Sequence, residues 1–520
     1  MSRDCLIGID IGTTAIKAVI YSVTGEMLGL GTNPNRLVEQ DGDHPTWTVW
    51  NPDALWDSVC SATKDALRNV GAEPVRTRGV AVTGLGQAGL PIGKDGKWLY
   101  PIISTQDSRT SAQHMSWKQQ FDLRRLHEIT GYPMLPFAGI NRIMWIRDHE
   151  PRKYAKMSKW LMIEDYVAFR LSKECFTDYT IASTTSAFDQ ANLCWSEEVF
   201  LSAGLDIGKM AQTCPSGTKI GAVSAESAAS TGLEEGTPVV SGAHDYFCAA
   251  LGSDAFDDWS ICDASGTWEI VSRVAGRTFA SEPLLREGLI FEAHAARDMY
   301  GIVSFFLSGG LIEWFKEHLG LSEREEASCS GTSPYDALGL TARRSGPGSS
   351  GVFLLPYFNA NGGPPDDPMC RGALFGLTSS TTRADIIHSL FEGLSYELRR
   401  RIEAIERCTG IEAEVIKVVG GVERNELWLS CKADIVGKPV RVTGIREATA
   451  LGAAMLAGVG SGVFKNERDA VRSMCKSGRI IEPNIGLTKL YSEYFETIYS
   501  NLYGATQDVH RTIGRMFPNE

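Results

Sequence analysis

The sequence predicts an α/β protein of two domains, each a mixed β-sheet with flanking helices. Its 520 residues exceed what one hydrophobic core usually organises. Two strand-like runs meet at a Gly-Thr-Thr turn within residues 6–21, and a similar Gly-Thr turn joins two such runs within residues 259–271. We therefore expect one domain over residues 1–250, a second over 251–490 and a helical extension over 491–520.

The first thirty residues predict a meander of three antiparallel strands. Val23-Thr24-Gly25-Glu26 supplies a second turn after the Gly-Thr-Thr turn, and a third strand-like run begins at Met27. Much later in the chain, Thr382-Arg383-Ala384-Asp385 resembles a capping box, and apolar residues follow it at helical spacing as far as Leu398. This pattern predicts a long helix with one buried face.

Residues 415–419 predict a buried strand that runs directly into Gly420-Gly421. Asn425 can then cap a helix that ends at Gly437, since asparagine is favoured before the first turn and glycine after the last. A strand, a glycine turn and a helix start together form a geometry suited to a nucleotide. Small residues from Ala448 to Val459 predict one more helix, whose alanines and glycines permit close backbone packing.

Composition indicates an ordinary globular protein, with 43% hydrophobic and 22% charged residues. No apolar stretch is long enough to cross a membrane, and the N-terminus lacks the features of a secretory signal. The net charge of −12, without a dense run of Lys and Arg, disfavours binding to nucleic acid. Twelve cysteines without a CxxC pair indicate reduced, mostly buried thiols. We expect a cytoplasmic protein without membrane or nucleic-acid partners, and a homodimer stays open.

The first candidate site is the turn Asp10-Ile11-Gly12-Thr13-Thr14 together with Lys17. Glycine lets the backbone approach a phosphate closely, hydroxyls and amides donate hydrogen bonds, and a carboxylate such as Asp10 can hold Mg²⁺. The alternative is a tight hairpin that merely carries an aspartate. The second turn, Gly266-Thr267, favours the phosphate interpretation, because it could face the first turn across a phosphate chain.

The second candidate site is Gly242-Ala243-His244-Asp245, which follows a strand-like run. An aspartate at the mouth of a cleft can accept the proton of a substrate hydroxyl and can also bind a metal ion. The local sequence alone favours a different role, in which Asp245 caps the helix predicted over residues 246–251. His244 could contact a substrate beside it.

A third set of polar residues suits a ligand with several hydroxyl groups. Gln87 and the segment Gln106-Asp107-Ser108-Arg109 bring amide, carboxylate and guanidinium groups to expected strand ends. Each hydroxyl of a sugar or polyol both donates and accepts hydrogen bonds, so a mixture of such groups can recognise it. The alternative is an exposed polar loop that contains an ion pair.

Taken together and in this order, these segments resemble the FGGY family of carbohydrate kinases, within the superfamily shared by actin, sugar kinases and heat-shock chaperones. The resemblance covers nearly the whole chain. It is most specific from Gly420 to Trp428 and from Glu447 to Ala454, and Asp367-Pro368-Met369-Cys370-Arg371-Gly372 is similar to the family's Asp-Pro-x-x-Arg-Gly stretch.

Two departures from the family pattern leave the substrate open. Ser104-Thr105 stand where the family often has a tryptophan before its Gln-Asp pair. Residues 242–247 differ from the Gly-Asp-Gln form of glycerol kinases and the Gly-Asp-Asn form of xylulokinases. A ketose of the xylulose or ribulose type and a linear polyol both remain compatible with the predicted polar set.

The resemblance implies two actin-like (ribonuclease H-like) domains with the active site in the cleft between them. It implies ATP and Mg²⁺ as cofactors, a small sugar or polyol as substrate, and closure of the domains to exclude water. Asp245 is the implied catalytic base and, with Asp10, the implied metal ligand. The implied substrate-binding residues are Gln87, Asp107, Arg109 and His244. The implied ATP-binding residues are Gly12, Thr13, Thr14, Lys17, Gly266, Thr267, Gly420, Gly421 and Asn425.

Other functions remain as alternatives on the sequence. A non-kinase ATPase, actin-like or chaperone-like, would need both phosphate turns but not the hydroxyl-binding set. A degenerate kinase that only senses sugar is disfavoured, because Asp10, Asp245 and both turns are present. A kinase for a sugar acid would need further cations, and Arg109 is the one cation of the predicted substrate set.

Overall fold

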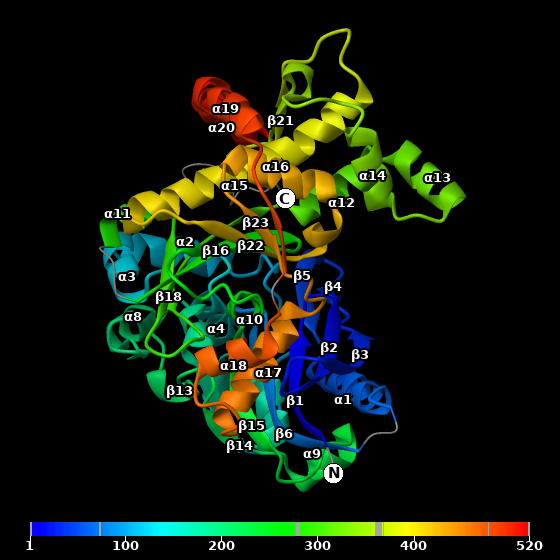
Figure 1. Cartoon of the computed structure of the whole chain (residues 1–520). Helices are drawn as coiled ribbons and strands as arrows, with labels where there is room; N and C mark the ends of the chain where they lie inside the picture. The colour runs from blue at the N-terminus through cyan, green and yellow to red at the C-terminus, as the bar shows by residue number, and fades with distance from the viewer. Residues whose placement is uncertain are drawn as a thin grey trace.

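The computed structural model describes residues 3–71, 74–276, 281–358, 367, 369–476 and 478–517 (Figure 1). Two large mixed sheets confirm the expected α/β architecture. In spatial order, the first contains β14 (Lys219–Ala222), β15 (Pro238–His244), β6 (Val75–Gly84), β1 (Arg3–Ile11), β2 (Ala15–Ser22) and β3 (Met27–Pro34). The second contains β18 (Ile290–Ala293), β19 (Tyr300–Leu307), β17 (Trp268–Ala275), β16 (Ser260–Ser265), β22 (Val415–Gly420), β23 (Val440–Val442) and β24 (Arg479–Ile481).

Smaller sheets accompany them. One has five strands, in the order β4 (Val38–Asp41), β5 (His44–Trp50), β8 (Ile102–Ile103), β7 (Gly89–Ile92) and β9 (Lys159–Met162). Three are strand pairs: β10 (Phe176–Asp178) with β13 (Gln212–Cys214), β11 (Phe188–Asp189) with β12 (Cys194–Trp195), and β20 (Phe353–Leu355) with β21 (Ala373–Phe375).

Helices flank the sheets of both halves. Those of the first half are α1 (Pro52–Arg68), α2 (Ser111–Gln120), α3 (Leu123–Thr130), α4 (Gly139–His149), α5 (Pro151–Lys156), α6 (Ile163–Ser172), α7 (Tyr179–Ser183), α8 (Glu197–Ser202), α9 (Ala225–Thr231) and α10 (Asp245–Gly252). Those of the second are α11 (Ser281–Arg286), α12 (Gly309–His318), α13 (Leu321–Ser330), α14 (Pro334–Ala342), α15 (Arg383–Thr409), α16 (Glu426–Val436), α17 (Ala448–Gly460), α18 (Glu467–Met474), α19 (Ile485–Tyr494) and α20 (Ser500–Met516).

Both predicted Gly-Thr hairpins are confirmed. β1 pairs with β2, and β2 with β3, all antiparallel, which gives the expected meander. The N–H of Gly12 donates to the carbonyl of Ala15 at 3.0 Å and closes the first turn. β16 pairs antiparallel with β17, and Gly266 donates to the carbonyl of Trp268 at 3.0 Å across the second turn. The two halves therefore repeat one local design.

Parallel strands bring the ends of distant segments to one edge of each sheet. In the first sheet β1, β6 and β15 run parallel, with Ile11 and His244 both in register with Gly84. In the second, β16 and β22 run parallel, with Ser265 in register with Gly420. Ligands of α/β proteins bind at the carboxyl ends of such strands. Each sheet therefore presents one edge on which candidate residues can gather.

The helices predicted in the second half form at their expected positions. Thr382 and Asp385 make the capping box of α15, with the hydroxyl of Thr382 accepting from the N–H of Asp385 and the carboxylate accepting from the N–H of Thr382. Asn425 caps α16 by accepting from the N–H of Trp428, and Gly437 ends that helix at a φ of 75°. Residues 359–366 and Pro368, which includes part of the Asp-Pro-x-x-Arg-Gly stretch, lie outside the described residues.

Small residues let α17 pack directly on the first half of the protein. A Cβ added to Gly8 would lie 1.9 Å from the carbonyl oxygen of Ala450, and one added to Gly452 would lie 1.9 Å from that of Cys248. Figure 1 shows α17 and α18 in orange beside β1, β6 and β15, away from α15 and α16. The chain thus returns to the first sheet after completing most of the second. The exact bounds of the two domains stay a prediction.

Apolar side chains form a core in each half and a third where the halves meet. One core surrounds β16, β22, α15 and α16, and another lies between β1, β6, α1 and α6. The third joins α10 and α17 with Leu6 of β1 and Val303 of β19. Seven of the twelve cysteines are buried. In the described part of the chain, no helix combines the length and apolarity that crossing a membrane requires.

Candidate active site

Asp10, Gln87 and Asp245 lie at one edge of the first sheet. Asp10 is the residue before the last in β1, Gln87 follows β6, and Asp245 directly follows β15. Burial and the negative charge of Asp245 raise the pKa of Asp10 to about 7, while Lys17 opposes this shift. The strand register thus brings two predicted metal ligands and one predicted substrate ligand into a single group.

Lys17 connects this edge to the segment before α17. It stands opposite Asp10 in the β1–β2 register, and its Nζ lies 2.7 Å from Oε2 of Glu447. Tyr21 donates to the carbonyl oxygen of Glu447 at 3.0 Å. One third of the Lys17 side chain is exposed, so the ammonium group remains reachable from solvent. The predicted phosphate turn is therefore anchored to a motif more than 400 residues further along the chain.

Asp245 is the first residue of α10, and 38% of its side chain is exposed. Its Oδ1 accepts from the N–H of Tyr246 at 2.7 Å and lies 2.8 Å from Nδ1 of His244. The N–H of Gly86 donates to Nε2 of His244 at 3.1 Å, which places the proton of a neutral imidazole on Nδ1. The capping position itself belongs to His244, whose side chain makes no capping bond. Asp245 keeps one oxygen, Oδ2, for a ligand.

Gln87 occupies a backbone conformation that few residues adopt. Its φ is 65°, and its N–H donates to Oγ1 of Thr184 at 3.0 Å. A Cβ on the preceding Gly86 would lie 2.5 Å from Cγ2 of Thr184 and 2.6 Å from Nε2 of His244. The left-handed backbone of Gln87 and the missing side chain at Gly86 therefore let the loop after β6 pack closely against His244 at the end of β15.

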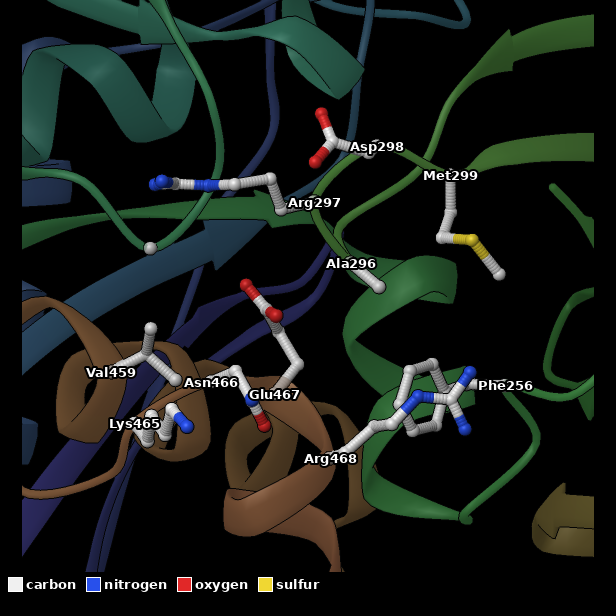
Figure 2. Close-up of a pocket in the computed structure, with 11 residues that line it drawn as sticks. Phe256, Ala296, Arg297, Asp298, Met299, Val459, Lys465, Asn466, Glu467 and Arg468 are labelled. Atoms are coloured by element: carbon white, nitrogen blue, oxygen red, sulfur yellow. The ribbon is translucent and has the colours of Figure 1, made fainter. Parts of the chain in front are cut away.

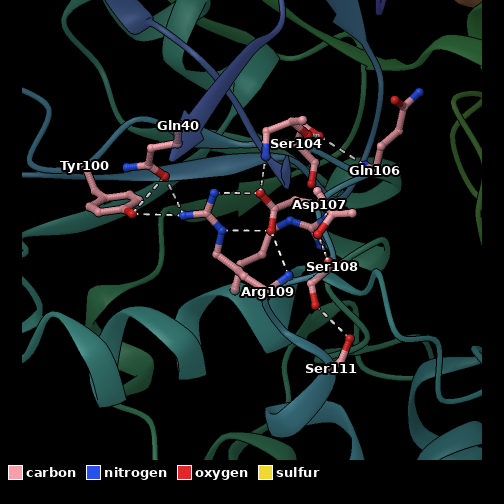
Figure 3. Close-up of polar contacts among 11 residues, drawn as sticks. Gln40, Tyr100, Ser104, Gln106, Asp107, Ser108, Arg109 and Ser111 are labelled. Atoms are coloured by element: carbon pink, nitrogen blue, oxygen red, sulfur yellow. Dashed lines mark hydrogen bonds and ion pairs between the residues drawn. The ribbon is translucent and has the colours of Figure 1, made fainter. Parts of the chain in front are cut away.

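Asp107 and Arg109 are fully buried against each other (Figure 3). The two Asp107 oxygens accept from Nε and Nη2 of Arg109 at 2.7 and 2.6 Å. Nη1 of Arg109 donates to Gln40 and to the hydroxyl of Tyr100, and the guanidinium lies 4.7 Å from the ring centroid of Trp47. The hydrogen bonds of this buried pair go to other groups of the protein. Direct contact of Asp107 or Arg109 with a substrate stays a prediction.

The predicted nucleotide residues gather at the edge of the second sheet. Gly266 and Thr267 form an exposed turn, and backbone N–H groups at the start of α12 donate to their carbonyls. Gly420 has a φ of 102°, and a Cβ there would lie 2.3 Å from the carbonyl oxygen of Ser265. Gly421 follows at the exposed surface, and Asn425 opens α16. The two glycine turns are therefore adjacent and offer backbone to a ligand.

Lys432 is a buried cation that the sequence analysis missed. Its Nζ contacts a carboxylate oxygen of Asp263, Oε1 of Glu269 at 2.7 Å and Oγ of Ser265 at 3.1 Å, and none of the three charged side chains is exposed. Burial and the charge of Asp263 raise the pKa of Glu269 to about 7. The ion cluster lies directly behind the Gly266-Thr267 turn. A lone lysine inside the apolar stretch of residues 428–435 was the available signal.

Glu164 is a second buried acid for which the sequence held no signal. Both of its carboxylate oxygens lack a hydrogen-bond partner among the described residues. Burial raises its pKa well above the usual range, and the charges of Asp165, Asp178 and Asp245 add to the effect. Glu164 therefore holds its proton more strongly than an ordinary carboxylic acid does.

Glu292 is a third buried acid and joins the two halves of the protein. It lies on β18, and its carboxylate accepts from the hydroxyl of Tyr132 at 2.6 Å and from the hydroxyl of Tyr246. Burial raises the pKa of Glu292 from its ordinary 4.5 to about 7. The side chain is not exposed at all.

We expect the stability of the protein to depend on the proton of Glu292. The folded state holds this proton up to about pH 7, whereas the unfolded chain releases it near pH 4.5, so rising pH favours unfolding between these values. Relative to Glu292→Gln, the wild-type protein should lose about 2 kcal/mol of unfolding free energy from pH 5 to pH 8. Thermal unfolding of both proteins from pH 5 to pH 8 measures this difference in unfolding free energy. Parallel plots of unfolding free energy against pH for the two proteins would contradict the prediction.

Asp10 and Asp245 fit a magnesium site in their chemistry. The described residues contain no group of three or more His, Cys, Asp or Glu side chains arranged to hold a metal ion. Mg²⁺ is usually bound by one or two carboxylates together with phosphate oxygens and water, so two carboxylates are sufficient. Burial and the negative charge of Asp245 raise the pKa of Asp10, and a bound cation would offset that negative charge.

A separate pocket of about 460 Å³ lies away from these residues (Figure 2). Loop 296–299 forms one wall and residues 465–468 form the opposite wall. None of the predicted catalytic, substrate or nucleotide residues lines it. The candidate site is therefore the pair of strand edges and not this pocket.

Comparison with known proteins agrees with the geometry. The FGGY family of carbohydrate kinases matches by its N-terminal domain over residues 5–252 and by its C-terminal domain over residues 264–461. The chain is 28% identical to an L-fuculokinase of Escherichia coli strain K12 over 473 residues, which are 90% of this chain and 95% of that protein. It is also 28% identical to a gluconokinase of Bacillus subtilis strain 168, over 91% of this chain and 90% of that one.

The fold also matches a solved structure. The crystal structure of a xylulose kinase from Rhodospirillum rubrum superposes with a TM-score of 0.85 over 97% of this chain and 99% of that chain, at 23% sequence identity. The two family domains together cover all the candidate residues of the two edges and most strands of both large sheets, while β24 lies beyond the second match. The chain therefore belongs to the FGGY family of carbohydrate kinases, enzymes that transfer phosphate from ATP to a sugar or polyol.

Proposed function

We propose that this kinase phosphorylates a hydroxyl group of a small neutral sugar or polyol, with Asp245 as the general base. The observation that carries the proposal is the placement of Asp245, half-exposed at the carboxyl end of β15 beside Asp10 and Gln87. A base needs a free oxygen within hydrogen-bond reach of the attacking hydroxyl. The contacts of Oδ1 leave Oδ2 for that role.

The two edges divide the work of the reaction. Exposed backbone at Gly266, Thr267, Gly420 and Gly421 would bind ATP, with Lys17 and the Gly12-Thr13-Thr14 turn opposite its phosphates. Oδ2 of Asp245 takes the proton of the substrate hydroxyl. At the same time the hydroxyl oxygen bonds to the γ-phosphorus, and the bond between that phosphorus and the oxygen of the leaving ADP breaks. His244, held by Gly86, orients the carboxylate through its Nδ1.

Asp10 would hold Mg²⁺, and Asp245 would contact the ion through water so that its Oδ2 stays available to the substrate hydroxyl; when bound, Mg²⁺ neutralises charge on the phosphate groups. Asp10 contributes by its fixed position on β1 and by its pairing across from Lys17. Closure of the two halves would exclude water, so that the sugar hydroxyl and not water attacks the phosphate.

The state of Arg109 supports a neutral substrate. A sugar acid calls for a cation that can reach its carboxylate. The guanidinium of Arg109 has no exposed surface and is already paired with Asp107, Gln40 and Tyr100. A neutral ketose of the xylulose or ribulose type, or a polyol, needs no such cation.

The proposal is tested by measuring ADP release from ATP and Mg²⁺ with a panel of possible acceptors. The panel contains L-fuculose, D-xylulose, D-ribulose, glycerol and gluconate. We expect one neutral member to raise ADP release at least about tenfold over the sugar-free rate, and gluconate to leave it unchanged. Selective use of gluconate would contradict the neutral substrate. Equal release with every compound would favour a non-kinase ATPase or a sugar-sensing protein.

A further inference from the structure

Glu292 and Tyr246 form a hydrogen-bonded connection from the second sheet to the proposed base. Glu292 belongs to β18, the edge strand of the second sheet, and Tyr246 is the residue after Asp245 in α10. The hydroxyl of Tyr246 donates to Oε1 of Glu292, and neither side chain is more than 8% exposed. A buried hydrogen bond to a charged or titratable group holds its donor in one orientation.

The ring of Tyr246 supports His244 from the side. The two ring centroids are 3.9 Å apart, with an interplanar angle of 35°. His244 in turn accepts from the N–H of Gly86 and places Nδ1 2.8 Å from Asp245. The N–H of Tyr246 also donates to the same Asp245 oxygen at 2.7 Å. Tyr246 therefore acts on the base through its backbone and through the histidine ring.

Strand β18 is fixed to the first half on both sides of Glu292. The N–H of Phe291 donates to the carbonyl of Gly131 at 2.9 Å, and the N–H of Ala293 donates to Oε1 of Gln190 at 2.9 Å. Glu292 therefore cannot move away from Tyr246 without breaking contacts between the halves. The hydrogen bond between Glu292 and Tyr246 therefore holds Tyr246 at a fixed distance from β18, next to Asp245.

We propose that Glu292 is a positioning residue for the reaction: by holding the hydroxyl of Tyr246 it fixes the turn between β15 and α10 on which His244 and Asp245 stand. The inference rests on the proposed role of Asp245 as base. Glu292 touches neither reacting group. Its effect should therefore fall on kcat and not on the KM of ATP or sugar.

The second ligand of Glu292 provides a matched control. Tyr132, which follows α3 and is 1% exposed, donates to Oε2 of the same carboxylate at 2.6 Å. Among the described residues, none of its hydrogen bonds reaches His244 or Asp245. Tyr132→Phe and Tyr246→Phe each remove one hydroxyl from one carboxylate. A purely structural role for Glu292 predicts equal effects of the two changes on activity.

The experiment compares kcat, both KM values and the melting temperature of these two variants with those of Glu292→Ala and Glu292→Gln, using the sugar found with the panel. We expect Tyr246→Phe and Glu292→Ala to lower kcat about tenfold to hundredfold, since a displacement of the base by about 1 Å has this effect. Both KM values should change less than about twofold. Tyr132→Phe should lower the melting temperature as much as Tyr246→Phe does, yet leave kcat within about twofold.

Glu292→Gln tests the same idea by rescue. Glutamine keeps an acceptor for Tyr246 and offers a donor to Tyr132, so kcat should stay within about threefold of the wild-type value. Equal kcat in Tyr132→Phe and Tyr246→Phe would overturn the inference. Asp245→Asn is measured in parallel: if that variant keeps the wild-type kcat, the assignment of the base fails instead, and the two failures are thereby distinguished.

Discussion

Asp245→Asn is expected to lower kcat about 10³-fold, because an amide cannot accept the proton of the attacking hydroxyl. The change keeps the size of the side chain. It also keeps an oxygen that can accept from the N–H of Tyr246, a hydrogen bond of 2.7 Å in the wild-type protein. The fold of α10 should therefore persist. The KM of the sugar should change little, since the lost interaction belongs to the transition state. ADP release with the preferred sugar measures both constants.

Asp65→Asn is a matched control for this change. Asp65 on α1 exposes 37% of its side chain, almost the same as the 38% of Asp245, and it pairs only with Arg68 at the surface. Its variant should keep the wild-type kcat, because a surface ion pair contributes little. If Asp245→Asn retained more than about a third of the wild-type kcat while the sugar was still phosphorylated, Asp245 would not be the base.

Lys432→Met is expected to lower the free energy of unfolding by about 3–5 kcal/mol. Methionine is close to lysine in volume, so the main loss is the charge that Asp263 and Glu269 share. Those two carboxylates would remain buried without their cation, and burial together with the charge of Asp263 already raises the pKa of Glu269 to about 7. Urea unfolding monitored by circular dichroism measures the change.

The control for this change is Lys153→Met at the surface. Lys153 exposes 39% of its side chain and pairs with Glu150 at 3.0 Å, so its loss should cost less than about 1 kcal/mol. Adding Glu269→Gln to Lys432→Met should recover part of the stability, because one of the two uncompensated acids is then neutral. Equal destabilisation by Lys432→Met and Lys153→Met would show that the buried cluster does not stabilise the fold.

Local chemistry was sufficient to predict the elements that carry the candidate site. Glycine turns between β-rich runs determined both hairpins, and Asn425 with Gly437 marked the two ends of α16, since caps and turns depend on neighbours within a few residues. The order of the motifs then implied which strand ends lie close together. The structure brings these ends to one edge of the sheet by parallel pairing, with Gly84 in register with both Ile11 and His244.

Contacts between distant segments could not be predicted in the same way. Hydrophobic periodicity shows that α17 is buried, but not that it returns to β1 of the first half. The sequence allowed Asp107 and Arg109 to bind a ligand or to form an ion pair in an exposed loop, and it could not show that the pair is buried with aromatic rings around Arg109. Burial of a charge depends on the partner that meets it, and that partner lies far away in sequence.

The sequence by itself therefore determined the α/β class, the two Gly-Thr turns, the helix ends and, through the order of its motifs, the kinase family. Only the tertiary structure decided that Lys432 neutralises Asp263 and Glu269 behind one turn, and that Glu292 holds Tyr246 beside Asp245. The physical reason is the range of the interactions. Turns and caps are set by adjacent residues, whereas a buried ion or a shared carboxylate is stable only when the fold brings its partners together and excludes water.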